Sequence, residues 1–198
     1  MMSAKPFSQA CANNRQPILD ILQRLFADRR QVLEIGSGTG QHAVFFAEHL
    51  PHLQWHTSDL IHNHAAINAW LADYSGNNLH APFELDVSQP IWPITADAVF
   101  SANTAHIMSW PVTQQMIVGV AKLLPVGGVF ALYGPFNYHG KFTSPSNAQF
   151  DLWLKQQGPH QGIRDFEAVV ARAAAGGLQL VEDNAMPTNN RLLAFKKC

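Results

Sequence analysis

Three glycines at alternate positions, preceded by an acidic residue, form the most informative pattern in this 198-residue sequence. The segment 32–40 reads Val-Leu-Glu-Ile-Gly-Ser-Gly-Thr-Gly. An apolar run that ends in such a cluster predicts a strand followed by a tight turn, where missing side chains let a ligand approach the backbone. Glu34 stands two residues before the first glycine, where a carboxylate favours a ligand with a cationic amino group over a diphosphate.

Two further carboxylates stand where the next two strands are expected to end. Asp59 follows the alternating segment 53–58, and Asp86 follows the segment 80–85. Ligands of open α/β sheets bind beyond the carboxyl ends of the strands, so we expect both carboxylates to lie near the glycine turn. The first can accept hydrogen bonds from the two ribose hydroxyls of a nucleoside, and the second can accept the amino group of adenine.

The glycine spacing also bears on an alternative ligand, NAD. The pattern Gly-x-Gly-x-x-Gly, counted from Gly36, requires a glycine at position 41, where this chain has Gln41. Taken singly, Glu34 fits a strand-end cap, and Asp59 and Asp86 fit ordinary turn residues. Together with the glycine spacing they favour a nucleoside ligand with a sulfonium and a cationic amino group, and they disfavour an NAD-dependent oxidoreductase.

The elements that must position these residues alternate along the chain. Strands separated by helices predict an α/β fold with a Rossmann-like, seven-stranded, mostly parallel sheet and helices on both faces. Only residues 184–190 join the last two strands, which predicts antiparallel neighbours and an antiparallel last strand. The hydrophobic periodicity predicts strands at 31–35, 53–57, 80–85, 96–102, 129–133, 178–183 and 192–196, and helices at 17–26, 41–50, 65–74, 111–124, 147–157 and 165–175.

We expect one domain over residues 1–198, with a helical N-terminal segment over about 1–28. A lid insertion is expected over about 134–162, because its opening is a long irregular stretch and such loops are usually functional covers. A packed loop without substrate contact is the alternative.

Composition narrows the class of protein. The formal net charge is -1 and 47% of the residues are hydrophobic, which excludes a disordered chain and offers no global electrostatic attraction to nucleic acid or membranes. No apolar run reaches the roughly 18 residues of a membrane helix. Two cysteines fit a reducing compartment, so we expect a cytoplasmic protein. We expect no metal site, because no cysteine or carboxylate stands at ligand spacing around His62 and His64.

Over most of its length the sequence resembles the class I methyltransferases that depend on S-adenosylmethionine (SAM). In that family the acidic residue and glycine turn hold the methionine part, and the acid that ends strand two holds the ribose. The family's turn Leu-Lys-Pro-Gly-Gly corresponds here to the shifted segment 123–128, Leu-Leu-Pro-Val-Gly-Gly. More narrowly, the chain is similar to the methyltransferase-like 26 family, also known as domain-of-unknown-function family 938, in the segments 11–18, 32–42, 100–106, 132–137, 140–147, 162–165 and 186–190.

The pattern and the resemblance together predict SAM as the cofactor and an unidentified methyl acceptor, a small molecule or protein in preference to nucleic acid. The alternative is a non-catalytic SAM-binding regulator or scaffold, because a fold alone does not establish catalysis. The residues predicted to bind SAM are Arg15, Glu34, Gly36, Ser37, Gly38, Thr39, Gly40, Asp59, Asp86, Val87 and Asn103.

Further residues are predicted to meet the acceptor. His106, three residues beyond Asn103, is the candidate catalytic base or hydrogen-bond donor, and a packed loop histidine is the alternative. Arg15 suits the methionine carboxylate or an acidic substrate, although a plain surface arginine fits equally well. The predicted substrate-binding residues are Asn14, Tyr133, Asn137, Lys141 and Asn190, with an aromatic wall from Phe136, Tyr138 and Phe142.

Overall fold

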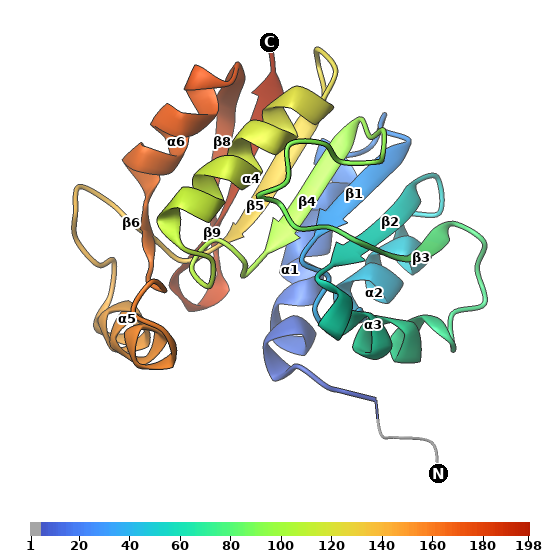
Figure 1. The fold of residues 1–198 in the computed structure, drawn as a ribbon, viewed down its shortest axis with the longest axis horizontal. Coiled ribbons are helices and arrows are strands. Elements are labelled where there is room, and N and C mark those ends of the chain that lie inside the picture. Colours follow the sequence, from blue (N-terminus) through green and yellow to red (C-terminus); the bar gives the residue numbers. More distant parts are fainter. Residues whose placement is uncertain (1–4) are drawn as a thin grey trace.

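Seven strands form one twisted sheet in a computed structural model that describes residues 5–198 (Figure 1). The first five run parallel, and the last strand runs antiparallel to both of its neighbours, as predicted. The sheet order is β3 (Leu79–Glu84), β2 (Gln54–Asp59), β1 (Gln31–Ile35), β4 (Ala98–Ala102), β5 (Val129–Gly134), β9 (Asn190–Lys197) and β8 (Leu178–Met186).

The helices are α1 (Gln9–Leu25), α2 (Gln41–His49), α3 (His64–Leu71), α4 (Trp110–Leu123), α5 (Pro145–Gln157) and α6 (Phe166–Ala175), with short 3-10 turns at Ile61–Asn63 and Pro187–Asn189. Helices cover both faces of the sheet, and its strands pack side chains into two hydrophobic cores, to which β3 adds only the partly buried Leu79 and Phe83. One core lies under α4 and α6 with residues of the 85–97 loop, and the other lies under α1 and α2. Figure 1 shows α4 and α6 in front of the sheet.

The first helix begins at Gln9, so the predicted start at residue 17 was wrong. Ser8 caps it by accepting a hydrogen bond from the backbone N–H of Cys11, and Pro17 lies inside it. The polar first half lacks the apolar periodicity that marks a helix in sequence, and a proline suits a first turn better than an interior. Because Pro17 has no N–H group, the backbone carbonyl of Asn13 has no helical donor. Asn13 is exposed, so this carbonyl can bond to water instead.

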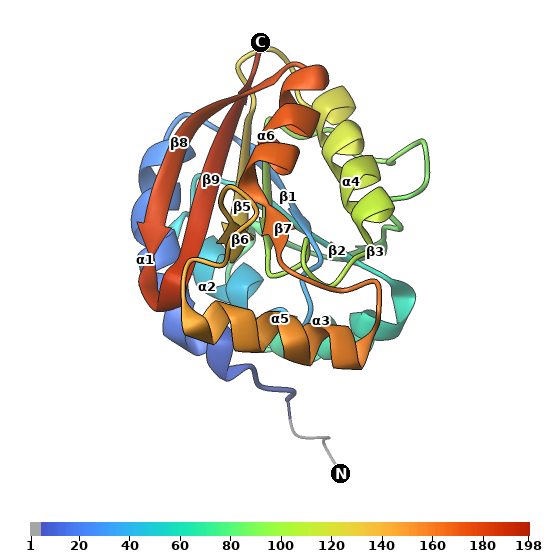
Figure 2. The same cartoon turned by 90° about the vertical axis from the view of Figure 1, so that its left-hand side faces the viewer.

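The segment 134–162 contains more regular structure than the single predicted helix. After β5 the chain forms β6 (Phe136–Asn137), which pairs in parallel with β7 (Arg164–Asp165), and α5 lies between them. Gly134 pairs with Arg191, so the β8–β9 turn lies at the carboxyl end of β5. In both views α5, the β8–β9 turn and the start of α1 lie at the same end of the sheet (Figures 1 and 2).

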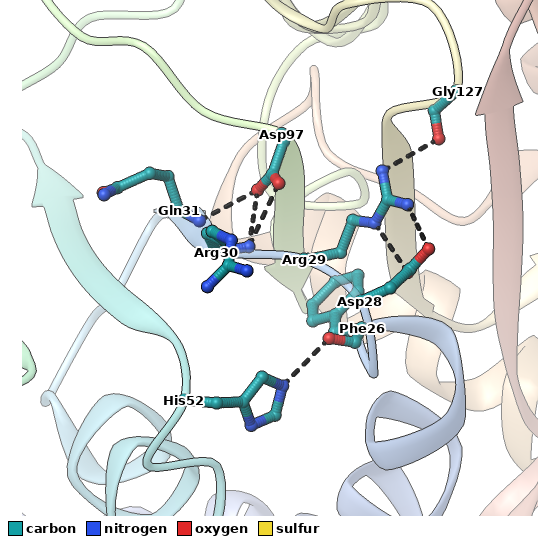
Figure 3. A network of polar contacts seen from close by, with 8 residues as sticks. All are labelled: Phe26, Asp28, Arg29, Arg30, Gln31, His52, Asp97 and Gly127. Carbon is teal, nitrogen blue, oxygen red and sulfur yellow. Dashed lines mark hydrogen bonds and ion pairs between the residues drawn. The ribbon is translucent and has the colours of Figure 1, made fainter.

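At the opposite end of the sheet, where the parallel strands begin, side chains form hydrogen bonds to backbone groups of neighbouring segments (Figure 3). The carboxylate of Asp97 accepts hydrogen bonds from the backbone N–H groups of Arg30 and Gln31, at 3.0 and 2.8 Å. Arg29 donates to the carbonyl of Gly127, and His52 bonds the carbonyl of Phe26. These contacts fix where β1 starts relative to β4. In the described part of the chain, no helix is long and apolar enough to cross a membrane.

Replacing Asp97 with alanine should lower the free energy of unfolding by about 2 kcal/mol, because hydrogen bonds to a charged acceptor stabilise by roughly 1.5–3 kcal/mol. Thermal unfolding checks this, with an expected fall in Tm of about 5 °C for a chain of this size. The control is Asp20→Ala, because the exposed Asp20 carboxylate accepts from Gln16 and from no other side chain or N–H group in the described residues 5–198. Equal Tm values for the two variants would contradict the role given to Asp97.

Candidate functional site

The glycine turn follows β1 and is held close to the end of β2. The backbone N–H groups of Gly36 and Ser37 both donate to the carbonyl of Ser58, at 3.1 and 3.0 Å. Gly36 has a φ of 72°, and a Cβ added there would lie 2.5 Å from Cγ2 of Thr104. Gly40 is equally constrained, since its Cβ would lie 3.1 Å from Cα of Ile67 in α3. Only glycine fits these two positions.

Glu34 lies beneath this turn with 2% of its surface exposed. Ser37 Oγ and Trp55 Nε1 both donate to its Oε2, at 2.9 and 3.1 Å, and no residue among 5–198 donates to Oε1. Burial raises the pKa of Glu34 to about 7, although the two hydrogen bonds oppose the shift. A nearby cation would favour the ionised form, so Glu34 is suited to bind a cationic group.

Asp59, at the end of β2, is buried and holds the glycine turn. Its Oδ2 accepts from the backbone N–H of Gly38 at 2.8 Å, and its Oδ1 accepts from Leu60 N and Asn63 Nδ2. A carboxylate has about four acceptor positions, so these bonds leave about one for a ligand. Asp59 can therefore accept a hydrogen bond from one ribose hydroxyl and not from both, as was expected, unless Leu60 or Asn63 moves.

Asp86 follows the end of β3 and keeps one oxygen available. Its Oδ1 accepts from the backbone and hydroxyl of Ser88, at 2.9 and 2.7 Å, and these bonds hold the pKa of Asp86 below its usual range. No residue among 5–198 donates to Oδ2. The neighbouring Val87 is buried, which gives an apolar surface beside an acceptor oxygen. This pairing suits the face and the amino edge of a heteroaromatic base.

The segment after β4 turns sharply at Asn103, which has a φ of 59° and donates its N–H to the carbonyl of Tyr133. Asparagine tolerates this left-handed conformation better than most residues. Ser101 and Thr104 hydroxyls bond each other at 2.6 Å, and Thr104 then lies against the glycine turn. The end of β4 thus lies close to Gly36.

His106 lies farther along this segment with 5% of its surface exposed. Its carbonyl accepts from the N–H of Gly162, and its ring meets Phe150 of α5 edge-on, with centroids 5.3 Å apart. No residue among 5–198 hydrogen-bonds its ring nitrogens. Burial and the nearby Arg164 lower the pKa of His106 to about 4, so the imidazole is neutral near pH 7. It can accept or donate one hydrogen bond but is a weak base.

Three of the predicted substrate-binding residues come together from distant segments. The buried Tyr133 lies near the side chains of Asn14 and Asn190: burial raises the pKa of its hydroxyl, and the two neighbouring amides oppose that shift. Asn14 Oδ1 also lies 2.7 Å from Nε2 of His42, in the first turn of α2. These contacts bring α1, β5 and the β8–β9 turn to the carboxyl edge of the sheet.

Two other predicted residues point elsewhere. Arg15 is exposed, and its guanidinium lies 4.7 Å above the ring of Phe45, which fits a surface arginine. Lys141 is exposed in a tight turn, where it exchanges backbone hydrogen bonds with Tyr138. Its side chain has no hydrogen bond or ion pair with any residue among 5–198, so neither position joins the cluster above. Asn137 lies in β6, and within the part of the chain that the structure describes its Oδ1 is buried without a hydrogen-bond partner.

A sequence model for the family described as "Protein of unknown function (DUF938)" matches residues 5–197. The chain belongs to the DUF938 family. Because the match covers almost the whole chain, the glycine turn, the strand ends and the segment 134–162 all lie within the DUF938 region.

Solved structures similar to this DUF938 protein are methyltransferases. They include an O-methyltransferase family protein from Burkholderia thailandensis (TM-score 0.82, 18% identity, covering 92% of this chain and 55% of that one) and an O-methyltransferase family 2 protein from Planctomyces limnophilus in complex with apigenin (0.81, 20%, 96% and 58%). PigF with SAH also matches (0.77, 18%, 92% and 61%). The DUF938 chain therefore has a methyltransferase Rossmann-like fold and spans little more than half the length of these structures.

The DUF938 structure also reveals residues that the sequence analysis did not assign to the site. Gln41 and Ser8 exchange hydrogen bonds between the Gln41 side chain and the Ser8 backbone, which ties the start of α1 to the glycine turn. Cys11 Sγ lies 3.9 Å from Nδ1 of His42. Burial raises the pKa of Cys11 and lowers that of His42 to about 4, so the pair lacks the thiolate that a nucleophilic cysteine requires. The polar side chains within 11–16 were the sequence signal that this helix borders the site, since a helix that only packs against a sheet would carry more apolar residues there.

Proposed function

We propose that this DUF938 protein is a SAM-dependent methyltransferase. The observation that carries the proposal is the arrangement at the carboxyl edge: Glu34 is buried with a free oxygen, and the glycine turn beside it has no room for a side chain at Gly36. Asp59 and Asp86 each keep acceptor capacity at the next two strand ends.

These residues fit SAM on chemical grounds. Glu34 would hold the cationic methionine part, one oxygen of Asp59 would accept from the ribose, and Asp86 would accept the adenine amino group beside Val87. Gly36, Ser37, Gly38, Thr39 and Gly40 would offer backbone to the ligand, with Ser37 acting through Glu34. A bound SAM supplies an activated methyl group on sulfur, so the protein mainly positions and desolvates the reactants.

The residues near the end of β4 would position the methyl acceptor. Asn103 would lie beside the methyl group, and His106 would orient the acceptor with a hydrogen bond. The acceptor forms a bond from oxygen or nitrogen to the methyl carbon, the bond from that carbon to sulfur breaks, and the acceptor's proton leaves. Because the pKa of His106 is about 4, its imidazole would pass this proton on to bulk water rather than keep it at pH 7, so His106 serves as a hydrogen-bond partner more than as the final base.

The test of catalysis is methyl transfer from SAM labelled in its methyl group, with an extract of small molecules and proteins as the source of acceptor. Labelled product supports the enzyme, whereas saturable SAM binding without any transfer supports the alternative, a SAM-binding regulator or scaffold. The observation that favours this alternative is the low pKa of His106, because the site then has no strong base near the end of β4.

Replacing His106 with alanine should lower the methyl-transfer rate about tenfold to 100-fold, because the acceptor loses a hydrogen bond that orients it. The affinity for SAM should stay within about twofold, since the contact belongs to the acceptor. His160→Ala, at an exposed position of the 158–162 segment, is the matched control. Turnover equal to that of the unchanged protein would rule out a role for His106.

A further inference from the structure

One flank of α5 carries two aromatic side chains stacked on each other next to His106. The rings of Phe150 and Trp153 have centroids 5.7 Å apart and an angle of 14° between their planes. Trp153 is 51% exposed, and Ile107, the neighbour of His106, is 50% exposed. Large apolar side chains left open beside a candidate site indicate a surface that a ligand covers.

His106 offers a polar group to a ligand beside these two rings, which we call the α5 wall. Only 5% of the surface of His106 is exposed, and its ring nitrogens form no hydrogen bond with residues 5–198. The segment that carries it is held in place, because Arg164 of β7 donates to the carbonyl of Ala105 next to His106. A ring nitrogen without a protein partner can bond to an O–H or N–H group of a ligand.

The charged groups beside these rings disfavour a cationic ligand group. Arg164 acts on His106 as a positive charge and donates to the backbone carbonyls of Ala105, Met108 and His160, and it forms no ion pair with a carboxylate among residues 5–198. On α5, Asp151 is buried and accepts from Lys155 and from the N–H of Ile163. A cationic ligand group would therefore meet the charge of Arg164 and no free carboxylate of α5.

We propose that the methyl acceptor is a planar aromatic compound with an O–H or N–H group and no cationic group. Its ring stacks on the Phe150 and Trp153 flank, and its polar group meets His106. That the compound is a methyl acceptor rests on the proposed function, whereas its chemical class rests on the wall alone. A rigid, flat molecule suits the wall better than a peptide, because the half-exposed ring of Trp153 can stack on another aromatic ring and the wall offers no row of backbone hydrogen-bonding groups.

The experiment titrates the full chain, with and without S-adenosylhomocysteine (SAH), using two probes of equal size. They are 2-naphthol, which is aromatic, and decahydro-2-naphthol, its saturated counterpart. We expect 2-naphthol to bind about tenfold more tightly, as stacking and edge contacts with aromatic rings provide. Phe150→Ala and Trp153→Ala should each remove most of this preference. Leu152→Ala is the control, because Leu152 is exposed on a different side of the same helix.

Equal affinity for the two probes, or equal loss in Leu152→Ala and Phe150→Ala, would overturn the aromatic site. If Phe150→Ala fails to fold, Trp153→Ala and Phe150→Leu provide the same test. The Tm of each variant shows whether it has a folding defect. A preference for 2-naphthol without any SAH binding would support the aromatic site and overturn the proposed function. Binding of SAH with capture of a protein in place of 2-naphthol would overturn the small-molecule class and leave the methyltransferase proposal standing.

Discussion

Gly36→Ala is expected to lower the affinity for SAM about 100-fold, which corresponds to roughly 2.8 kcal/mol. Part of the loss arises because a φ of 72° costs a residue with a side chain about 1–2 kcal/mol, which the free turn relieves by relaxing away from the conformation that binds SAM. The rest arises because the new Cβ would lie 2.5 Å from Thr104 Cγ2, so the turn or the segment after β4 must move. Both border the proposed cofactor site. Isothermal titration with SAM measures the effect.

The matched control is Gly127→Ala at the opposite edge of the sheet. Gly127 has a φ of 83° and nothing within 4 Å of an added Cβ, so this variant has similar strain without a collision. It should lose stability and keep its SAM affinity. Adding Thr104→Ser to Gly36→Ala removes the colliding methyl and should recover part of the affinity. Wild-type affinity in Gly36→Ala would contradict the placement of the ligand at this turn.

Glu34→Gln is expected to bind SAM about 30-fold more weakly at pH 8, because it removes a buried charge opposite a cationic ligand; loss of one partner of a buried pair costs about 3–5 kcal/mol at most. Burial raises the pKa of Glu34 from 4.5 to about 7. The unchanged protein must therefore lose a proton to pair with the ligand at lower pH. Its affinity should rise about tenfold between pH 6 and pH 8, about fivefold of this between pH 6 and pH 7, and level off above pH 8. The variant should show no such rise.

The same substitution should make the free protein more stable at pH 8. A carboxyl with a raised pKa binds more protons when folded, so its contribution to stability falls as the pH rises from about 4.5 to 7. Removing the charge recovers up to about 3 kcal/mol above pH 7. Thermal unfolding at pH 5 and pH 8 measures this, and Glu48→Gln on the exposed face of α2 is the control. A variant that binds SAM normally, or that loses stability at pH 8, would contradict the role of Glu34.

Strong periodic segments made most of the fold predictable. The strand at 31–35 is confirmed because an apolar run bounded by turn residues has few other stable arrangements. The antiparallel last strand is confirmed because the short connection 184–190 leaves no room for a crossover. The start of α1 was missed because its polar first half has no apolar pattern. This half is held instead by the Ser8 cap and by the tertiary contact of Asn14 with His42. The pairing of β6 with β7 involves two residues in each strand, too few to leave a pattern in sequence.

The candidate site was predictable only as far as strand ends allow. Placing Glu34, Asp59 and Asp86 at one edge follows from a parallel sheet, since successive carboxyl ends share that edge. Side-chain partners do not follow from sequence. The bonds that occupy Asp59 and the joining of Asn14, Tyr133 and Asn190 depend on rotamers and on contacts between distant segments.

The most direct measurement is titration of the purified chain with SAM and, separately, with NAD, by isothermal calorimetry at pH 8. The account predicts one SAM site per chain, no saturable heat with NAD, and proton release on SAM binding at pH 6.5 that is absent in Glu34→Gln. Saturable NAD binding with no SAM binding would contradict the assignment of the glycine turn, Glu34 and Asp59 to a sulfonium nucleoside.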